Sequence, residues 1–374
     1  MSCPGERVYP LRKPPNHKLP VPRFHHRLRA GIDHIFTTYI GIQVRSDGAR
    51  ASQAGAEAVR AVQEWLEDPD SRPAAWESFA LIDGVDQPGT SVWVCYFDDE
   101  SRYNSGLTHL NLDKIHAGLD AHGRASVGLW RESFKSADAR LETNYSGTDY
   151  LPGLCRLPGT TAVEHELATY WGAARDRIPD SAHDLFEQAD EALLAILPED
   201  MTPRGTGQHL SGTNYANLVH IRSGQFWETC GAEEAAAYEQ KLEPALRAGL
   251  AYLWEHERET GSRALRYLRN QEIRTDYGRG CCGGQEEARK ESCGAGFFTS
   301  LGALERWSRT HRSHLAIYGG ALAHYKAFPG ERRRLRTWHE VSVLRAGDAR
   351  FEYVNCAPRT GVIGTLKLDI KDIR

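Results

Sequence analysis

The chain has 374 residues, of which 40% are hydrophobic, and its 46 basic and 50 acidic side chains leave a formal net charge of −4. This composition supports a sizeable core, and the charge gives no general attraction to nucleic acid or to an anionic membrane. No signal peptide is evident and no window approaches the ~18 apolar residues of a spanning helix, so we expect a cytoplasmic protein. Eight irregularly spaced cysteines favour buried thiols over a disulfide framework.

The first part of the chain predicts an arm followed by strand, helix, strand and strand. Prolines and basic residues recur through residues 1–30, which is typical of an extended N-terminal arm lying on the surface or on a partner subunit. Alternation predicts a strand over 39–44, and apolar residues at helical spacing predict a helix over 52–68. The segments 78–85 and 90–97 predict a hairpin, and because its second strand is apolar on both faces, each face needs a cover.

The second part of the chain follows a similar order. A helix is predicted over 181–197, and the turn-rich segment 201–208 then marks a boundary. Beyond this boundary, 214–223 predicts a strand, and 233–254 predicts two helices with Pro244 in the first turn of the second.

The segment 300–358 carries the most distinctive pattern. Residues 300–320 predict one helix whose apolar face also holds two histidines. Residues 337–344 predict a strand with His339 on an apolar face, and 350–356 predict a second strand that forms a hairpin with it.

The repeated order of elements predicts an α+β protein. We expect two ferredoxin-like halves of the dimeric α+β barrel type, formed by residues 31–200 and 201–374.

Six segments identify a resemblance that spans nearly the whole chain. They are YIGIQVR (39–45), YWGAARDR (170–177), NLVHIRSGQFW (217–227), ERWSRTHRSHLAIY (305–318), WHEVSV (338–343) and FEYVNCAPRTG (351–361). Together they resemble the haem-containing aldoxime dehydratases, the phenylacetaldoxime dehydratase family. The resemblance implies a homodimer that binds haem b between its sheet and helices. It also implies that the protein converts small aldoximes, R–CH=N–OH, into nitriles and water while ferrous iron binds the oxime nitrogen.

The resemblance implies roles for two histidines. His314 matches the axial ligand of the haem iron, with His311 as its rival three residues away. His339 matches a distal acid–base residue, because an imidazole can give a proton to a departing hydroxyl and recover one. Without the resemblance, such histidines are more often hydrogen-bonded structural residues.

Three further residues are implied in the distal part of the pocket. Ser223 matches a serine that donates to the substrate hydroxyl, although a turn residue is the commoner reading of its position. Arg177 matches a distal arginine, with Arg175 as the alternative, and the ordinary reading of both is a solvated helix face. Glu142 matches a glutamate near the same pocket, and the resemblance leaves open whether His339 or a carboxylate such as Glu142 takes the proton from carbon.

Other patterns give weaker signals. The Cys- and Gly-rich stretch 276–296 contains GxGxxG without a strand before it or a helix after it, and it lacks paired CxxC motifs, so we expect a loop rather than a dinucleotide or zinc site. The basic run 332–336 predicts a solvated loop in which one arginine could pair with a haem propionate.

Two other functions use the same elements. A haem peroxidase or dismutase could be built on the same scaffold, since fold does not fix function. A haem carrier or sensor would need His314 but not Ser223, Arg177 and His339 together.

Overall fold

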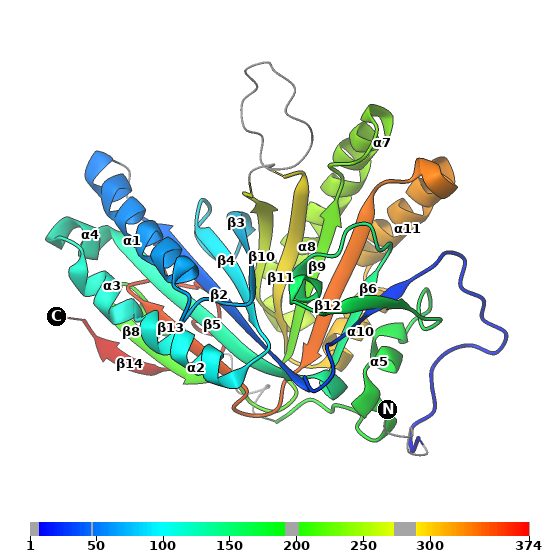
Figure 1. Cartoon of the computed structure of the whole chain (residues 1–374), viewed down its shortest axis with the longest axis horizontal. Coiled ribbons are helices and arrows are strands. Elements are labelled where there is room, and N and C mark those ends of the chain that lie inside the picture. Colours follow the sequence, from blue (N-terminus) through cyan, green and yellow to red (C-terminus); the bar gives the residue numbers. More distant parts are fainter. Residues whose placement is uncertain (1–6, 46–47, 191–201, 273–288, 374) are drawn as a thin grey trace.

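A computed structural model of the chain describes residues 7–45, 48–190, 202–272 and 289–373. The strands of this described part form one antiparallel sheet of 14 strands, flanked by helices (Figure 1). In order across the sheet they are β14 (Asp369–Asp372), β8 (Gln208–Thr213), β13 (Ala349–Val354), β5 (Val127–Ala137), β2 (His34–Val44), β4 (Ser91–Phe97), β3 (Ala75–Gly84), β10 (Ser262–Asn270), β11 (Glu291–Phe298), β9 (Val219–Phe226), β12 (Arg336–Val343), β6 (Leu141–Tyr145), β1 (Phe24–Arg27) and β7 (Thr161–Glu164).

The helices gather at the two ends of the molecule (Figure 1). At one end lie α1 (Ala49–Glu67), α2 (Glu100–His109), α3 (Leu112–Gly118) and α4 (Ala121–Ser126). Toward the other end lie α5 (Ala173–Arg177), α7 (Ala232–Ala237), the π-helix η5 (Tyr238–Leu242), α8 (Glu243–Glu255), α9 (Glu257–Thr260), α10 (Leu301–Thr310) and α11 (Arg312–Ala327). Short 3₁₀ turns are η1 (Asp138–Arg140), η2 (Gly153–Arg156), η3 (Pro179–Ala182) and η6 (Gly330–Arg332). Within the described ranges no helix is long and apolar enough to cross a membrane.

The strand order contains the same arrangement twice. The strands β2 to β5 occur in the order β5-β2-β4-β3, and β9 to β12 occur in the order β12-β9-β11-β10. When the strands of a set are counted in chain order, each set lies across the sheet in the order fourth, first, third, second. The two sets join where β3 pairs with β10. The two parts of the chain also exchange strands, because β6 pairs with β12 and β13 pairs with β5.

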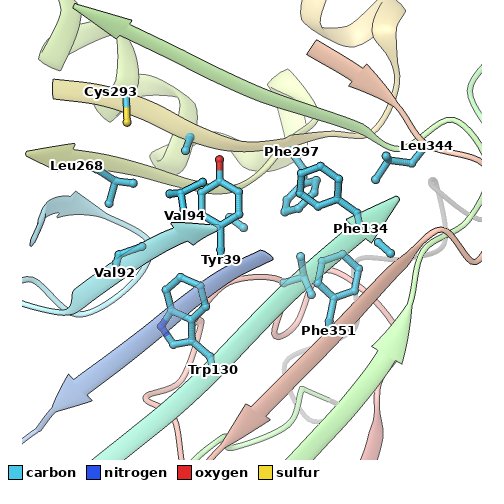
Figure 2. Packing of buried hydrophobic residues seen from close by; sticks show 14 of the residues in the cluster. Tyr39, Val92, Val94, Trp130, Phe134, Leu268, Cys293, Phe297, Leu344 and Phe351 are labelled. Atoms are coloured by element: carbon cyan, nitrogen blue, oxygen red, sulfur yellow. The ribbon is translucent and has the colours of Figure 1, made fainter. Parts of the chain in front are cut away.

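The two sets of strands face each other across an inner core (Figure 2). Phe134 on β5 and Phe297 on β11 are not neighbours within the sheet, yet their ring centroids lie 6.1 Å apart. Tyr39 on β2 likewise reaches across, and its hydroxyl lies 3.0 Å from Nε2 of His220 on β9. Two outer cores lie on the opposite faces, one under α1 to α3 and one under α8 and α10. The chain thus forms layers of helix, sheet, sheet and helix.

A glycine and a tryptophan recur at matching places in the two sets. Gly41 pairs with Trp130, and a Cβ at Gly41 would lie 2.0 Å from the indole ring. Gly224 pairs with Trp338, and a Cβ there would lie 2.4 Å from that ring. Each indole therefore lies over a strand where only glycine fits. This match shows which positions in one half of the fold correspond to which positions in the other half.

The predicted strand 39–44, the helix 52–68 and the hairpin 78–97 are confirmed. Both faces of β4 are buried as expected, because one lies in the inner core and the other packs under the α1 end of the molecule. The described cysteines are free, and four of these five are buried.

The helix predicted over 181–197 is wrong in its described part. Only Ser181 and Ala182 belong to a helical turn, and 183–190 form no helix, while 191–197 fall outside the described residues. The Asp184 side chain accepts a hydrogen bond from the backbone of Phe186 at 2.7 Å, and Phe186 adopts a φ of 53°. A local side-chain bond of this kind competes with the helix.

The single helix predicted over 300–320 is divided in two. The residue His311 has an extended backbone, with ψ at 131°, and its Nδ1 accepts from the backbone N–H of Ser313 as the N-cap of α11. The helix α10 therefore ends before His311 and α11 begins after it.

Two further expectations are corrected. The strands 337–344 and 350–356 do not form a hairpin, because β12 pairs with β9 and β6 while β13 pairs with β5 and β8. Asn214 holds the connection between them through hydrogen bonds to Arg345 O and from the backbone of Ala349. The loop expected over 276–296 is a buried strand from Glu291 onward, and 276–288 lie outside the described residues.

Candidate active site

A cavity of about 830 Å³ lies between the outer face of β9 and β12 and the helices α8, α10 and α11. Much of its wall is apolar, with side chains that include Ile221, Leu246, Leu250, Leu253, Phe298, Leu301, Leu304, Ile317 and Val341. Such a volume and lining are typical of a site for a cofactor or small molecule.

His314 lines the cavity from the first turn of α11. Its ring lies between two indoles, with centroids 4.9 Å from Trp307 and 6.1 Å from Trp171. Burial lowers the pKa of His314, and the backbone of Ser308 opposes only part of this effect. His314 is therefore held as a neutral imidazole, the form that binds a metal.

The rival His311 does not line the cavity. Its Nδ1 lies 2.7 Å from the hydroxyl of Ser313, and its ring stacks on Tyr252 with centroids 4.0 Å apart. These contacts give His311 a structural role as the N-cap of α11.

A row of polar residues crosses the sheet side of the cavity. His339 on β12 pairs in register with Ser223 on β9 and with Asn144 on β6, so the three side chains emerge on one face. No group of the described residues hydrogen-bonds the hydroxyl of Ser223, which leaves it able to donate to a ligand.

Arg177 and Glu142 complete this polar group. The guanidinium of Arg177 donates from Nε to Glu142 Oε2 at 2.7 Å, and its Nη2 lies 3.0 Å from His339 Nε2. Glu142 Oε1 lies 3.1 Å from the same imidazole nitrogen. When that nitrogen is unprotonated it can accept from Arg177, and when it is protonated it can donate to Glu142, so both protonation states have a partner. Arg175 instead binds Glu305 and does not line the cavity.

The reverse face of the same strands is fixed by buried charges. Arg222, next to Ser223, donates to Glu77 at 2.7 Å, and its guanidinium carbon lies 4.7 Å from the ring centre of Trp338. Glu340, next to His339, accepts from the hydroxyl of Tyr96 at 2.9 Å. The strands that present Ser223 and His339 are therefore anchored from behind.

Glu142 is completely buried and does not line the cavity. Burial alone would raise its pKa, but the charges of Arg177 and His339 together outweigh burial and hold the pKa at about 2. Glu142 is thus ionised throughout the neutral range, and it acts as a fixed negative charge behind Arg177 and His339.

We expect Glu142→Gln to lower the free energy of unfolding at pH 7 by about 3–5 kcal/mol, because it leaves the Arg177 charge buried without its partner. Since folding lowers the Glu142 pKa from 4.5 to about 2, its stabilisation is complete above pH 4.5 and is lost as the pH falls through about 2. Urea unfolding of both proteins at pH 7, 4 and 3 measures this. A difference that does not shrink between pH 4 and pH 3 would contradict it.

In the other half of the fold, the positions that correspond to His339 and Ser223 hold residues that do not form a polar site. Arg131 occupies the place of His339 and pairs with Ile40, which occupies the place of Ser223. Ile40 packs in the outer core, and Arg131 donates to the backbone carbonyls of Leu107 and Leu110. Of the two sets of strands, only β9 to β12 therefore carry a serine and a histidine at these positions.

Sequence reasoning missed several polar residues of the cavity, among them Asn144, Gln225 and Arg23. Gln225 lies two residues beyond Ser223 and shares its face, so strand alternation could have indicated it. Asn144 could be assigned to the cavity only from the pairing of β6 with β12, which no local sequence pattern predicts.

The cavity suits the haem expected from the resemblance. No group of three or more His, Cys, Asp or Glu side chains able to hold a bare metal ion occurs among the residues that the structure describes. The cavity offers one neutral imidazole, that of His314, among apolar walls. These features fit a large apolar cofactor whose metal takes a single axial ligand from the protein.

Comparison with known proteins agrees with this geometry. The family model for haem-containing dehydratases matches residues 38–362. The phenylacetaldoxime dehydratase of Bacillus sp. (strain OxB-1) is 32% identical over 285 residues, which are 76% of each chain. The aliphatic aldoxime dehydratase of Pseudomonas chlororaphis is 28% identical over 97% of this chain and 96% of its own. The crystal structure of the aldoxime dehydratase OxdRE in complex with butyraldoxime matches with a TM-score of 0.78 and 27% identity, over 98% of this chain and 94% of that chain. The chain therefore belongs to the family of haem-containing dehydratases.

Proposed function

We propose that this chain is a haem-dependent aldoxime dehydratase, a lyase that converts R–CH=N–OH into R–C≡N and water. The observation that carries the proposal is the group formed by His339, Arg177 and Ser223 on the wall of a cavity that His314 also lines. A carrier or sensor of haem has no need of these three side chains together.

His314 is the residue that we assign as the ligand that would hold the haem iron, in the cavity between the sheet and the helices. Its position on the cavity wall and its neutral ring support this assignment over His311. Bound ferrous haem supplies electron density to the oxime nitrogen, which weakens the N–O bond.

The distal side chains manage the two protons of the reaction. Ser223 and Arg177 orient the oxime hydroxyl, and the apolar wall takes the alkyl or aryl substituent. In the protonated ring of His339, Nε2–H donates to Glu142 Oε1, and Nδ1 carries the second hydrogen, which has no partner among the described residues. That Nδ1–H protonates the leaving hydroxyl to form water and leaves a neutral ring, whose Nδ1 then takes the proton from carbon as the nitrile forms. The ring thus returns to its starting protonation state.

Glu142 positions this group rather than accepting the carbon proton. Its low pKa makes it a weak base, and its carboxylate is turned toward Arg177 and His339 behind the cavity wall. In this position it supports a positive charge on His339 when the imidazole is protonated.

Ser223→Ala should lower the rate of nitrile formation by roughly 10²- to 10³-fold, because a donor to the developing charge on the hydroxyl oxygen is lost. Haem content should stay at the wild-type level, since the hydroxyl is directed at the substrate. The rate is measured by chromatography of the nitrile, and haem by its Soret absorption. Loss of haem or of folding would instead assign Ser223 to the structure of β9.

Several parts of the expected organisation stay predictions. The repeated strand order supports two ferredoxin-like halves with a boundary near residue 200, beyond an N-terminal arm of residues 1–30. The homodimer that the resemblance implies and the cytoplasmic location also stay predictions.

A further inference from the structure

The N-terminal arm brings a buried arginine to the cavity. Its described residues before β1 contain no helix or strand, and they lie along the chain's own surface, where the backbone N–H of Arg12 donates to Asp176. Arg23, at the end of this arm, lines the cavity and is only 8% exposed. Within the described ranges it forms no ion pair with a carboxylate, and its guanidinium donates to Pro22 O and to the hydroxyl of Tyr325.

A second arginine lies on the same tyrosine. The guanidinium of Arg333 lies 4.1 Å from the ring centre of Tyr325, and its buried Nε has no hydrogen-bond partner among the described residues. Burial lowers the pKa of Arg333, and the nearby charge of Arg23 lowers it further. Two cations thus lie close together, and neither has a paired anion in the described part of the chain.

Glu234 is the carboxylate whose charge raises the pKa of Arg333, but its oxygens bind other groups. Glu234 accepts hydrogen bonds from the backbone N–H groups of Arg334 and Leu335, and it lies 3.2 Å from His324 Nε2. Two neighbouring guanidinium groups without a free carboxylate repel each other, and burial of such charges is costly unless an anion joins them.

We propose that Arg23 binds a carboxylate of the bound haem, namely one of its two propionates, and that the charge of Arg333 beside it strengthens this binding. This inference rests on the proposed function, because it requires haem in the cavity. Haem is apolar except for its propionates, so its carboxylates are expected beside cations of the cavity wall, which include Arg12, Arg23, Arg177 and Arg309. Arg12 and Arg177 are paired with carboxylates and Arg309 is exposed, which leaves Arg23 as the buried cation without a paired anion among the described residues. Arg23 lines the cavity from a segment that precedes the first strand. Arg333 comes from the basic run before β12 and does not itself line the cavity, but its guanidinium lies on the ring of Tyr325, whose hydroxyl accepts from Arg23. The arm therefore joins the cofactor site to α11 through Tyr325.

A comparison of haem with haem dimethyl ester, in which both propionates are uncharged, distinguishes propionate binding from a purely structural role of the arginines. Each is added to the haem-free protein, and its transfer to apomyoglobin is followed by absorption. Wild type should hold haem about tenfold longer than the ester, because charge-assisted hydrogen bonds to the carboxylate are lost in the ester. Arg23→Gln and Arg333→Gln should release haem about tenfold faster than wild type and release the ester at the wild-type rate.

Arg332→Gln is the matched control, because Arg332 belongs to the same run but is exposed and lies 3.6 Å from Glu233. It should behave as wild type, and Arg23→Lys should recover part of the preference for haem. Equal retention of haem and ester by wild type would overturn the proposal, as would faster release of both from Arg23→Gln, which indicates a structural role. Failure of wild type to bind either compound would overturn both this inference and the proposed function.

Discussion

His314→Ala yields a folded protein that has lost its haem. The axial nitrogen is the one strong bond that the cavity offers to iron, and the remaining contacts are apolar packing and the charges of the propionate site. We expect the haem content after purification to fall from about one equivalent per chain to near zero. The Soret absorption measures haem, and circular dichroism confirms the fold.

His311→Ala is the control, because His311 lies three residues away and caps the same helix without lining the cavity. It should keep its haem, although loss of the cap should cost about 1 kcal/mol of stability. If His311→Ala lost haem and His314→Ala kept it, the assignment of the axial ligand would be wrong.

His339→Ala should retain haem and still bind aldoxime, with nitrile formation slowed by about 10²- to 10⁴-fold. The imidazole is the only group of the described cavity wall placed between Arg177 and Glu142, where both of its protonation states find a partner. Aldoxime binding is read from the shift of the Soret band, and turnover from chromatography of the nitrile.

His165→Ala serves as the control for this variant. His165 lies close to the site, with Nε2 3.2 Å from Asn144 Oδ1, but it does not line the cavity. Burial, together with the charge of Arg177, lowers its pKa to about 3, so it cannot exchange protons near neutral pH. Its loss should leave the rate within about threefold of wild type, since it neither lines the cavity nor exchanges protons near neutral pH. Near-normal turnover by His339→Ala would remove His339 from the chemistry.

Local sequence patterns predicted the elements better than their pairing. Alternation located β2, β4, β9 and β12 and the faces that they bury, because a strand's period is visible within a few residues. Pairing is non-local, so the neighbours of β12 and β13 could not be read from the turn between them. The same limit hid Arg23, which is 302 residues from Tyr325 in sequence.

The strand β11 shows a second limit. Its sequence, ESCGAGFF, is poor in the β-branched residues that favour strands, and it was expected to continue a loop. Gly296 is required there by its neighbours, since a Cβ would lie 2.8 Å from the backbone carbonyl oxygen of Ala264. Close approach of two strands thus selects a residue that sequence patterns associate with turns.

Nitrile formation from butyraldoxime by the haem-loaded protein, compared between dithionite-reduced and oxidised iron under anaerobic conditions, tests the proposed activity most directly. A neutral imidazole ligand leaves the ferrous state accessible, and electron density reaches the N–O bond more readily from ferrous than from ferric iron. The reduced protein should therefore convert aldoxime to nitrile with equal amounts consumed and formed, and the oxidised protein should bind aldoxime without dehydrating it. Equal nitrile from both states, or peroxide-dependent dye oxidation with no nitrile from either, would contradict the proposed chemistry and favour a haem peroxidase.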